Sequence, residues 1–331
     1  MREEQGGGQP RRAKASAADK APAADRAPAA DRAPAVQRDA APQRQQRHER
    51  AARLLEILNL EPIEQNLYRG FNEDRGEFRL FGGQVLAQAL RAACHTAADR
   101  APHSLHAYFM RAGNAAKPVL YEVDRIRDGR SFTTRRVVAI QDGEAIFSMS
   151  VSLQVEETGL MHSASMPNVP LPDELEDDLD LVARLDLSHP GLSPMAGRAR
   201  PFETRSVFSP GSEAASGGRS WNPVWIRFCE PLSEADERLP VCLLAYASDM
   251  GLVSTALLPF GNTIARSAVQ MASLDHSLWI HRAPAAGEWL LLHKRTTSAA
   301  GARGMVHAEF YDVNGQLIAS VSQEGLMREI D

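Results

Sequence analysis

A motif that occurs twice along the chain constrains the fold more than any other feature. His103-Ser104-Leu105-His106 returns as His276-Ser277-Leu278-Trp279, and the turn signal Asp142-Gly143 returns as Asn314-Gly315. Both pairs lie about 172 residues apart, which indicates one duplicated structural unit rather than two coincidences. A chain of 331 residues is long enough for about two domains. The sequence therefore predicts two related units in tandem.

The first unit is expected to contain one buried helix and a run of strands. Gly82-Gly83 opens a stretch rich in alanine and leucine that continues to Ala93 and is apolar on most faces, which is typical of a buried helix. Strand-like runs follow, and Asp128-Gly129 and Asp142-Gly143 between them are hairpin signals. These runs cover residues 104–110, 119–127, 131–141 and 145–155.

The second unit repeats this order. An apolar helical stretch, 242–258, surrounds Asp249 and is followed by further strand-like runs. The runs cover residues 277–281, 289–297, 303–311 and 317–326, and a shorter one over 224–228 precedes the helix. One helix followed by antiparallel strands in each unit predicts an α+β fold in which each sheet wraps round a central helix.

The remaining segments have the composition of tails and linkers. Residues 1–47 are low in complexity, with prolines that interrupt helices and almost nothing to bury, and predict a disordered Ala/Pro-rich tail. Residues 157–220 are rich in proline and acidic residues and predict a linker, because so long a connection is improbable inside one compact domain. The N-terminal unit is then 48–156, beginning with a short amphipathic helix, and the C-terminal unit is 221–331.

Composition argues against several classes of protein. The net charge of -5 is mild and argues against nucleic acid as the main partner. Cys94, Cys229 and Cys242 form no CxxC pair, which fits a reducing cytoplasm and predicts neither a metal site nor a disulfide framework. We expect no membrane helix, because we find no apolar run near the roughly 20 residues it needs. The polar start and the end at 328–331 predict neither a signal peptide nor a peroxisomal address.

Three polar residues stand among apolar ones in the second unit. Asp249 lies in the helical stretch, whereas Thr297 and Gln323 lie in strand-like runs. A carboxylate can accept a proton, and a hydroxyl and an amide can both donate and accept, so together they could orient a water molecule. Taken singly, each residue has an ordinary structural role, Asp249 as a helix N-cap and the other two as strand residues.

Other candidate residues remain open. His103 and His276 could act as bases, but their recurrence in both units favours a structural role at a strand start. Gly82-Gly83 permits close approach of a ligand or another backbone, and the helix beyond it offers free N–H groups. Arg282 and Arg303 could bind phosphates or could be surface charges. The chain has no Gly-x-Ser-x-Gly motif for a serine nucleophile.

The chain resembles the acyl-CoA thioesterase II family from about Ile57 to Arg328. Short segments in a specific order carry this resemblance. They are Phe81-Gly82-Gly83-Gln84-Val85, His103-Ser104-Leu105-His106-Ala107-Tyr108-Phe109, Arg127-Asp128-Gly129-Arg130-Ser131-Phe132, Ala245-Tyr246-Ala247-Ser248-Asp249, Leu274-Asp275-His276-Ser277-Leu278-Trp279, Thr297-Ser298-Ala299 and Gln323-Glu324-Gly325.

The resemblance implies a double hot-dog fold and hydrolysis of medium- to long-chain fatty acyl-CoA without metal or organic cofactor. The catalytic Asp, Thr and Gln of the family map onto Asp249, Thr297 and Gln323, and we expect substrate contacts at Gly82-Gly83 and Arg303. A homo-oligomer, dimer or tetramer, is expected by analogy. We expect one complete site, because the first unit places the glycine pair about where the second places Asp249.

Two other functions are alternatives to this one. A hot-dog enoyl-CoA hydratase or dehydratase needs a histidine paired with a carboxylate for proton transfer. Asp275 and His276 are adjacent, so in a strand they would point to opposite faces, which counts against that reaction. A non-catalytic acyl-CoA-binding protein is the second alternative, and the presence of all three polar residues argues against it.

Overall fold

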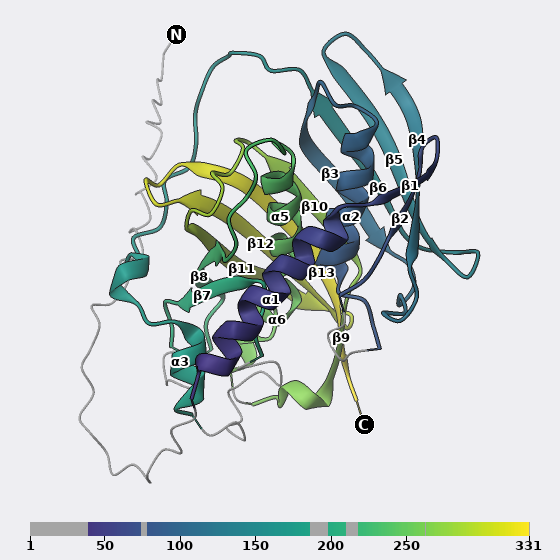
Figure 1. Ribbon diagram of the computed structural model, residues 1–331. Coiled ribbons are helices and arrows are strands. Elements are labelled where there is room, and N and C mark those ends of the chain that lie inside the picture. Colours follow the sequence, from purple (N-terminus) through teal and green to yellow (C-terminus); the bar gives the residue numbers. More distant parts are fainter. Residues whose placement is uncertain (1–38, 74–77, 186–197, 210–217, 262, 331) are drawn as a thin grey trace, which may run out of the picture. The chain divides into compact units, whose positions relative to one another are not determined.

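The structure is a computed structural model that describes residues 39–73, 78–185, 198–209, 218–261 and 263–330 (Figure 1). Most of the predicted tail, residues 1–38, therefore lies outside the described residues. The rest of that stretch is different from the prediction, because helix α1 (Ala41–Leu58) already begins within it. Arg47 is buried and donates two hydrogen bonds of 2.7 Å to Asp177, so tertiary contacts hold this part of the helix.

Among the described residues, thirteen strands form one antiparallel sheet. Their order is β1-β2-β4-β5-β6-β3-β10-β13-β12-β11-β8-β7, with β9 paired to β13. The strands are β1 (Glu61–Glu64), β2 (Leu67–Gly70), β3 (Ala101–Phe109), β4 (Val119–Asp128), β5 (Phe132–Gln141), β6 (Glu144–Gln154), β7 (Phe202–Ser206), β8 (Trp221–Phe228), β9 (Val269–Ser273), β10 (Asp275–Ile280), β11 (Leu290–Ala300), β12 (Arg303–Asp312) and β13 (Leu317–Glu329). The α+β class and the predicted strand runs are confirmed.

The sheet order shows the predicted repeat directly. Read outward from the centre, β3-β6-β5-β4-β2 on one side corresponds to β10-β13-β12-β11-β8 on the other. The two copies of the repeated motif pair with each other there, with Leu105 opposite Leu278. The turns Asp142-Gly143 and Asn314-Gly315 join equivalent strand pairs, β5–β6 and β12–β13. The two units are therefore related by a pseudo-twofold axis near the Leu105–Leu278 pair.

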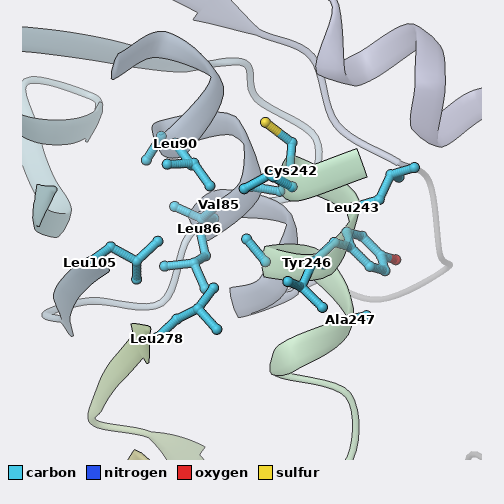
Figure 2. Close-up of a cluster of buried hydrophobic side chains, with 14 of the residues drawn as sticks. Val85, Leu86, Leu90, Leu105, Cys242, Leu243, Tyr246, Ala247 and Leu278 are labelled. Atoms are coloured by element: carbon cyan, nitrogen blue, oxygen red, sulfur yellow. The ribbon is translucent and has the colours of Figure 1, made fainter. Parts of the chain in front are cut away.

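Helices α2 (Gly82–His95) and α5 (Leu239–Ser248) pack against each other on the inner side of the sheet. Figure 2 shows Leu86 of α2 between Leu105 and Leu278, which point toward it from the two central strands. All three leucines are completely buried. Most core residues of both units belong to one hydrophobic cluster, so the units share a core as well as a sheet. A smaller cluster in the C-terminal unit contains Trp225, Trp289, Leu291 and Tyr311.

The first glycines of α2 set how closely the two helices approach. A Cβ atom at Gly83 would overlap the backbone oxygen of Tyr246 on α5 and the ring of Phe81. A Cβ atom at Gly82 would lie 2.8 Å from Oδ2 of Asp249. The predicted close approach of another backbone at Gly82-Gly83 is thus confirmed.

One helical stretch corrects an expectation from the sequence. Leu239–Phe260 is long and apolar enough to cross a membrane by length and composition, although we expected no such run. It consists of α5, the short α6 (Leu252–Thr255) and a 3₁₀ turn over Leu258–Phe260. Most of the stretch is buried inside the fold, which accounts for its apolar composition as that of a core helix.

The described part of the predicted linker 157–220 also contains regular structure. It holds a 3₁₀ turn over Pro172–Glu174, helix α3 (Asp178–Ala183) and β7, and β7 pairs with β8 at the edge of the sheet. The side chain of Trp225 donates a 2.8 Å hydrogen bond to the carbonyl of Pro170. The stretch therefore packs on the C-terminal unit and completes its sheet.

We predict that Gly83→Ala destabilises the fold, because the new methyl group would meet the Tyr246 carbonyl, a backbone atom that cannot move aside easily. Overpacking of this kind typically costs about 1–3 kcal/mol. Gly159→Ala is the matched control, since a Cβ atom there has no neighbour within 4 Å. Urea unfolding of the two variants checks this, and equal midpoints would contradict the packing argument.

Candidate active site

Asp249 ends α5 and is almost completely buried. It occupies the C-cap position, and the chain then turns at Gly251, whose φ of 67° is in the left-handed region. Only 7% of Asp249 is exposed. The predicted N-cap role of Asp249 is thus wrong, because the residue ends one helix instead of beginning the next. A buried carboxylate needs partners, and two other elements supply them.

Gln323 of β13 and Ser273 of β9 surround one oxygen of Asp249. The Gln323 amide nitrogen donates to Oδ1 of Asp249 at 3.1 Å and to the Ser273 hydroxyl at 2.8 Å. The Ser273 hydroxyl in turn donates to Oδ1 at 3.2 Å. A carboxylate, a hydroxyl and an amide thus converge at one place, which is the donor and acceptor set needed to hold a water molecule.

Strand pairing brings Ser273 to this position. β9 pairs with the end of β13, where Ser273 lies opposite Gly325, two residues after Gln323. Residues two apart on a strand point to the same face, so Ser273 and Gln323 are neighbours on the inner face. Sequence reasoning missed Ser273, because nothing in the sequence shows that 269–273 pairs with the end of β13.

Thr297 does not join this cluster. In the β11–β12–β13 ladder, Thr296, Val306 and Gln323 form one row of neighbouring residues, and all three are buried. Thr297 follows at a bulge between Thr296 and Ser298, and its side chain is exposed. It is also two strands away from Gln323, about 10 Å at the usual strand spacing. Of the three predicted catalytic residues, the structure brings together Asp249 and Gln323.

His276 fixes the orientation of the Gln323 amide. The Nδ1 atom of His276 lies 2.5 Å from Oε1 of Gln323, and its Nε2 atom lies 2.8 Å from the Ser248 hydroxyl. Because an amide oxygen only accepts, the Nδ1–H of His276 donates to it, and the amide NH₂ must then face Asp249 and Ser273. His276 is completely buried. It acts through Gln323 and is a positioning residue.

Burial and hydrogen bonds shift the pKa values of Asp249 and His276. Burial raises the pKa of Asp249 above its ordinary value, although His276, Gln323, Ser273 and the backbone N–H of Gly83 oppose the shift. Burial likewise lowers the pKa of His276, so the imidazole stays neutral near pH 7. A carboxylate with a raised pKa holds a proton more readily, which suits a general base.

Asp249 faces a cavity of about 580 Å³ that both units line. Its wall includes the start of α2 at Gly82, the end of β3 at Phe109, and Phe147 of β6. The second unit contributes Asp249 and Ser273. The site is therefore a mainly apolar cavity with one carboxylate, a form common among small-molecule sites.

Comparison with known proteins agrees with this geometry. A family model described as acyl-CoA thioesterase N-terminal domain matches residues 73–154, and one described as acyl-CoA thioesterase C-terminal domain matches residues 172–327. The crystal structure of an acyl-CoA thioesterase II, TesB2 from Mycobacterium marinum, has a TM-score of 0.68 and 37% identity, covering 84% of this chain and 98% of that one. Acyl-coenzyme A thioesterase 8 of Mus musculus is 38% identical over 290 residues, which are 84% of this chain and 90% of that protein. The chain belongs to the acyl-CoA thioesterase II family.

The fold of this thioesterase is also that of a double hot-dog protein. A hot-dog-fold protein of unknown function from Alicyclobacillus acidocaldarius superposes with a TM-score of 0.67 at 18% identity, covering 84% of this chain and 98% of that one. At that identity the likeness concerns the fold alone. The C-terminal family match begins at residue 172, earlier than the boundary we predicted at 221, which agrees with the pairing of β7 to β8.

The two units of the thioesterase differ at equivalent positions. Thr96 caps the C-terminal end of α2 where Asp249 caps α5. Leu105 pairs with Val151, and Leu278 pairs with Val321. Leu153 and Gln323 each follow two residues later, so they occupy equivalent positions. The N-terminal counterparts therefore carry no carboxylate or amide. Buried Arg135 bonds to Thr96 at 2.8 Å.

The expected correspondence of Gly82-Gly83 with Asp249 was wrong. The glycines begin α2, whereas Asp249 follows the end of α5, so the two are not equivalent by the repeat. They are neighbours in space because the start of α2 packs against the end of α5. Gly82 nevertheless lines the cavity, as expected for a substrate contact.

The two arginines considered from the sequence lie away from the cavity wall. Arg303 forms an ion pair with Glu324 at 2.8 Å and is half exposed. Arg282 donates a 2.9 Å hydrogen bond to the carbonyl of Leu317. Neither lines the cavity that contains Asp249. In the described part of the chain, no group of three His, Cys, Asp or Glu side chains is placed to hold a metal ion.

We predict that His276→Ala lowers both stability and turnover, because it leaves the Gln323 oxygen unpaired and frees the amide to rotate. An unsatisfied buried acceptor costs about 1–3 kcal/mol. His103→Ala is the matched control, since His103 occupies the equivalent place in the N-terminal unit but bonds to Ser152 at 2.8 Å. Thermal unfolding and thioester hydrolysis would be measured for both, and equal turnover in the two variants would exclude the positioning role.

Proposed function

We propose that this thioesterase hydrolyses medium- to long-chain fatty acyl-CoA by direct attack of a water molecule. The observation that carries the proposal is the convergence of Asp249, Ser273 and Gln323 beside a mainly apolar cavity. Ser273 takes the place that the resemblance gave to Thr297. A thioester is reactive enough that placing a water and stabilising the oxyanion are the main tasks.

The proposed reaction uses each residue for a distinct task. Gln323 and Ser273 hold the water beside Asp249, and Asp249 takes one of its protons as the oxygen attacks the thioester carbon. The resulting tetrahedral oxyanion collapses and the carbon–sulfur bond breaks. The proton held by Asp249 passes to the thiolate, which gives free CoA, a fatty acid and the starting carboxylate. No bond forms between the protein and the acyl group.

The start of α2 is the proposed oxyanion-binding element. Gly82 lines the cavity, and its position is close to Oδ2 of Asp249. The first N–H groups of a helix have no partner within the helix and carry partial positive charge. The Gly83 N–H already faces Asp249 and lowers its pKa, which leaves the N–H of Gly82 for the developing oxyanion.

The lining of the cavity supports a fatty acyl substrate. Its apolar side chains come from both units and include residues that cannot hydrogen-bond to a polar chain. They are Leu80, Phe81, Val85, Phe109, Met110, Ile146, Phe147, Leu252, Val253, Met271 and Leu274. Burial of an alkyl chain against them stabilises the complex by about 0.8 kcal/mol for each methylene group, which favours longer chains.

The contacts of His276 argue against a hydratase or dehydratase mechanism. That chemistry needs a histidine nitrogen facing the substrate, but both ring nitrogens of His276 are occupied, by Gln323 and by Ser248. Asp275 points to the opposite face of the strand from His276, and its carboxylate accepts a hydrogen bond from the backbone N–H of Glu324 at 2.7 Å. The two adjacent residues thus serve different faces of β10, as the strand pattern predicted.

A cytoplasmic location and a homo-oligomeric state, dimer or tetramer, also belong to this proposal. The free thiols of Cys94, Cys229 and Cys242 support the reducing compartment. The analogy with family members supports the oligomer. Acyl-CoA is the proposed partner, and the net charge of -5 supports the absence of a nucleic acid partner.

We predict that Asp249→Asn reduces turnover by about 100-fold or more, the range typical of a lost acid–base group. Ser273→Ala should reduce it by about tenfold or more, because the water loses one of its partners. Thr297→Ala should leave turnover unchanged, because its side chain is exposed on β11. Release of free thiol from a series of acyl-CoA esters, short to long, measures all three.

The same assay can contradict the proposed catalytic site. If Thr297→Ala loses activity and Ser273→Ala does not, the geometry described here is not the catalytic one. A covalent acyl adduct on the protein, detected by intact mass after mixing with substrate, would instead replace water attack by an acyl-enzyme. If the unmodified protein releases thiol from no ester, the non-catalytic acyl-CoA-binding alternative takes its place.

We further predict an acid limb in the pH profile of kcat/KM. The base must be ionised, so kcat/KM falls as the pH drops through the pKa of Asp249, which burial raises above the ordinary 3.8. Ser273 lowers that pKa through its hydrogen bond, so Ser273→Ala should move the acid limb to higher pH. Thr297→Ala should leave the acid limb in place. If the Ser273→Ala profile is identical to the Thr297→Ala profile, the assignment of the acid limb to Asp249 is disproved.

A further inference from the structure

We propose that Arg200, Arg266 and Lys294 form a phosphate-binding edge on the C-terminal side of the active-site cavity. The ligand groups would be the diphosphate or the 3′-phosphate of CoA. This inference rests on the proposed function, since it names the part of the substrate that the cavity edge binds. The residues were not singled out by any sequence motif, and they come from separate segments of the chain.

Arg266 and Arg200 both line the cavity that contains Asp249. Arg266 lies in the 3₁₀ turn Arg266–Ala268 just before β9, and Arg200 lies just before β7. The guanidinium of Arg266 is half buried and makes no hydrogen bond or ion pair with the residues that the structure describes. Burial lowers its pKa, and no carboxylate among the residues that the structure describes pairs with this guanidinium.

Lys294 adds a buried positive charge behind this wall. Only 6% of it is exposed, and within the described chain its ammonium group has no hydrogen-bond or ion-pair partner. A Cβ atom placed on Gly251, which lines the cavity, would lie 3.5 Å from Nζ of Lys294. The ammonium therefore lies directly behind the cavity wall. A buried ammonium without a partner is costly, and an anionic ligand in the cavity would offset that cost.

The charges around Lys294 are mostly positive. Burial, Arg200 and Arg219 lower the pKa of Lys294 and Asp178 raises it, and the net value is about 8. Asp178 is engaged elsewhere, since it accepts hydrogen bonds from the backbone and hydroxyl of Ser206 at 2.9 and 2.8 Å. Arg219 donates to the carbonyl of Trp221 at 3.0 Å. Among the residues that the structure describes, one carboxylate and two guanidinium groups thus act on the Lys294 ammonium.

Phosphate is the chemical class that matches this arrangement. A guanidinium presents several N–H donors in a fork that fits phosphate oxygens, and a lysine adds a point charge. On the N-terminal side of the cavity, Arg111 already forms an ion pair with Glu144 at 3.0 Å. Asp249 is the only carboxylate among the lining residues of the described chain, so an anionic ligand meets little repulsion.

The test compares three ligands: CoA, 3′-dephospho-CoA, which lacks only the 3′-phosphate, and pantetheine, which lacks the adenosine and all phosphates. Their binding to the full-length protein would be measured by calorimetry for the wild type, Lys294→Met and Arg266→Gln. Each variant should bind CoA about tenfold more weakly, the loss expected for one charge-assisted interaction. Pantetheine should bind all three proteins equally. Lys117→Met is the matched control, since Lys117 pairs with Asp142 on an exposed surface.

The outcomes separate the sources of the phosphate and the two proposals. A loss seen with CoA and absent with 3′-dephospho-CoA assigns the 3′-phosphate, and a loss seen with both assigns the diphosphate. Equal binding of CoA by the wild type and both variants overturns the inference. Lys294→Met should also raise the melting temperature, which shows that weaker binding is not misfolding. If CoA binds in this phosphate-dependent way but no ester is hydrolysed, the proposed function fails and this site remains.

Discussion

The contact between the start of α2 and the end of α5 is the constraint on which the site depends. Two glycines permit it, because a side chain at Gly82 would press on Asp249 and one at Gly83 would press on the Tyr246 backbone. The contact places free N–H groups of one unit beside the carboxylate of the other. Since both helices belong to one hydrophobic cluster, any change in their separation would spread through the shared core.

The duplication supplies two geometrically equivalent places, but only one of them has the chemistry. Asp249 and Gln323 in the C-terminal unit correspond to Thr96 and Leu153 in the N-terminal unit. Arg135 is buried next to Thr96. A buried carboxylate is costly, so a single site limits that cost to one place. The N-terminal unit is not redundant, because its α2 and β3 form the opposite wall of the cavity.

The buried polar groups at the site raise the free energy of the folded state and prepare it for chemistry. Asp249 is kept ionisable inside the core by Gln323, Ser273 and His276, and burial raises its pKa. Lys294 has no partner among the described residues, and its pKa is lowered to about 8, mainly by burial. Groups like these are destabilising on their own, and the extensive apolar core offsets them.

Local patterns in the sequence determined the repeat, the strands, the helix after Gly82-Gly83, and the candidates Asp249 and Gln323. The alternation of apolar and polar residues and the turn signals are properties of neighbouring residues, so they can be recognised without knowledge of the fold. Only the tertiary structure decided that Ser273, and not Thr297, joins the carboxylate, because cross-strand pairing sets which residues face each other. Ordered residues before 48 and the pairing of β7 likewise depend on partners far along the chain, such as Asp177 for Arg47.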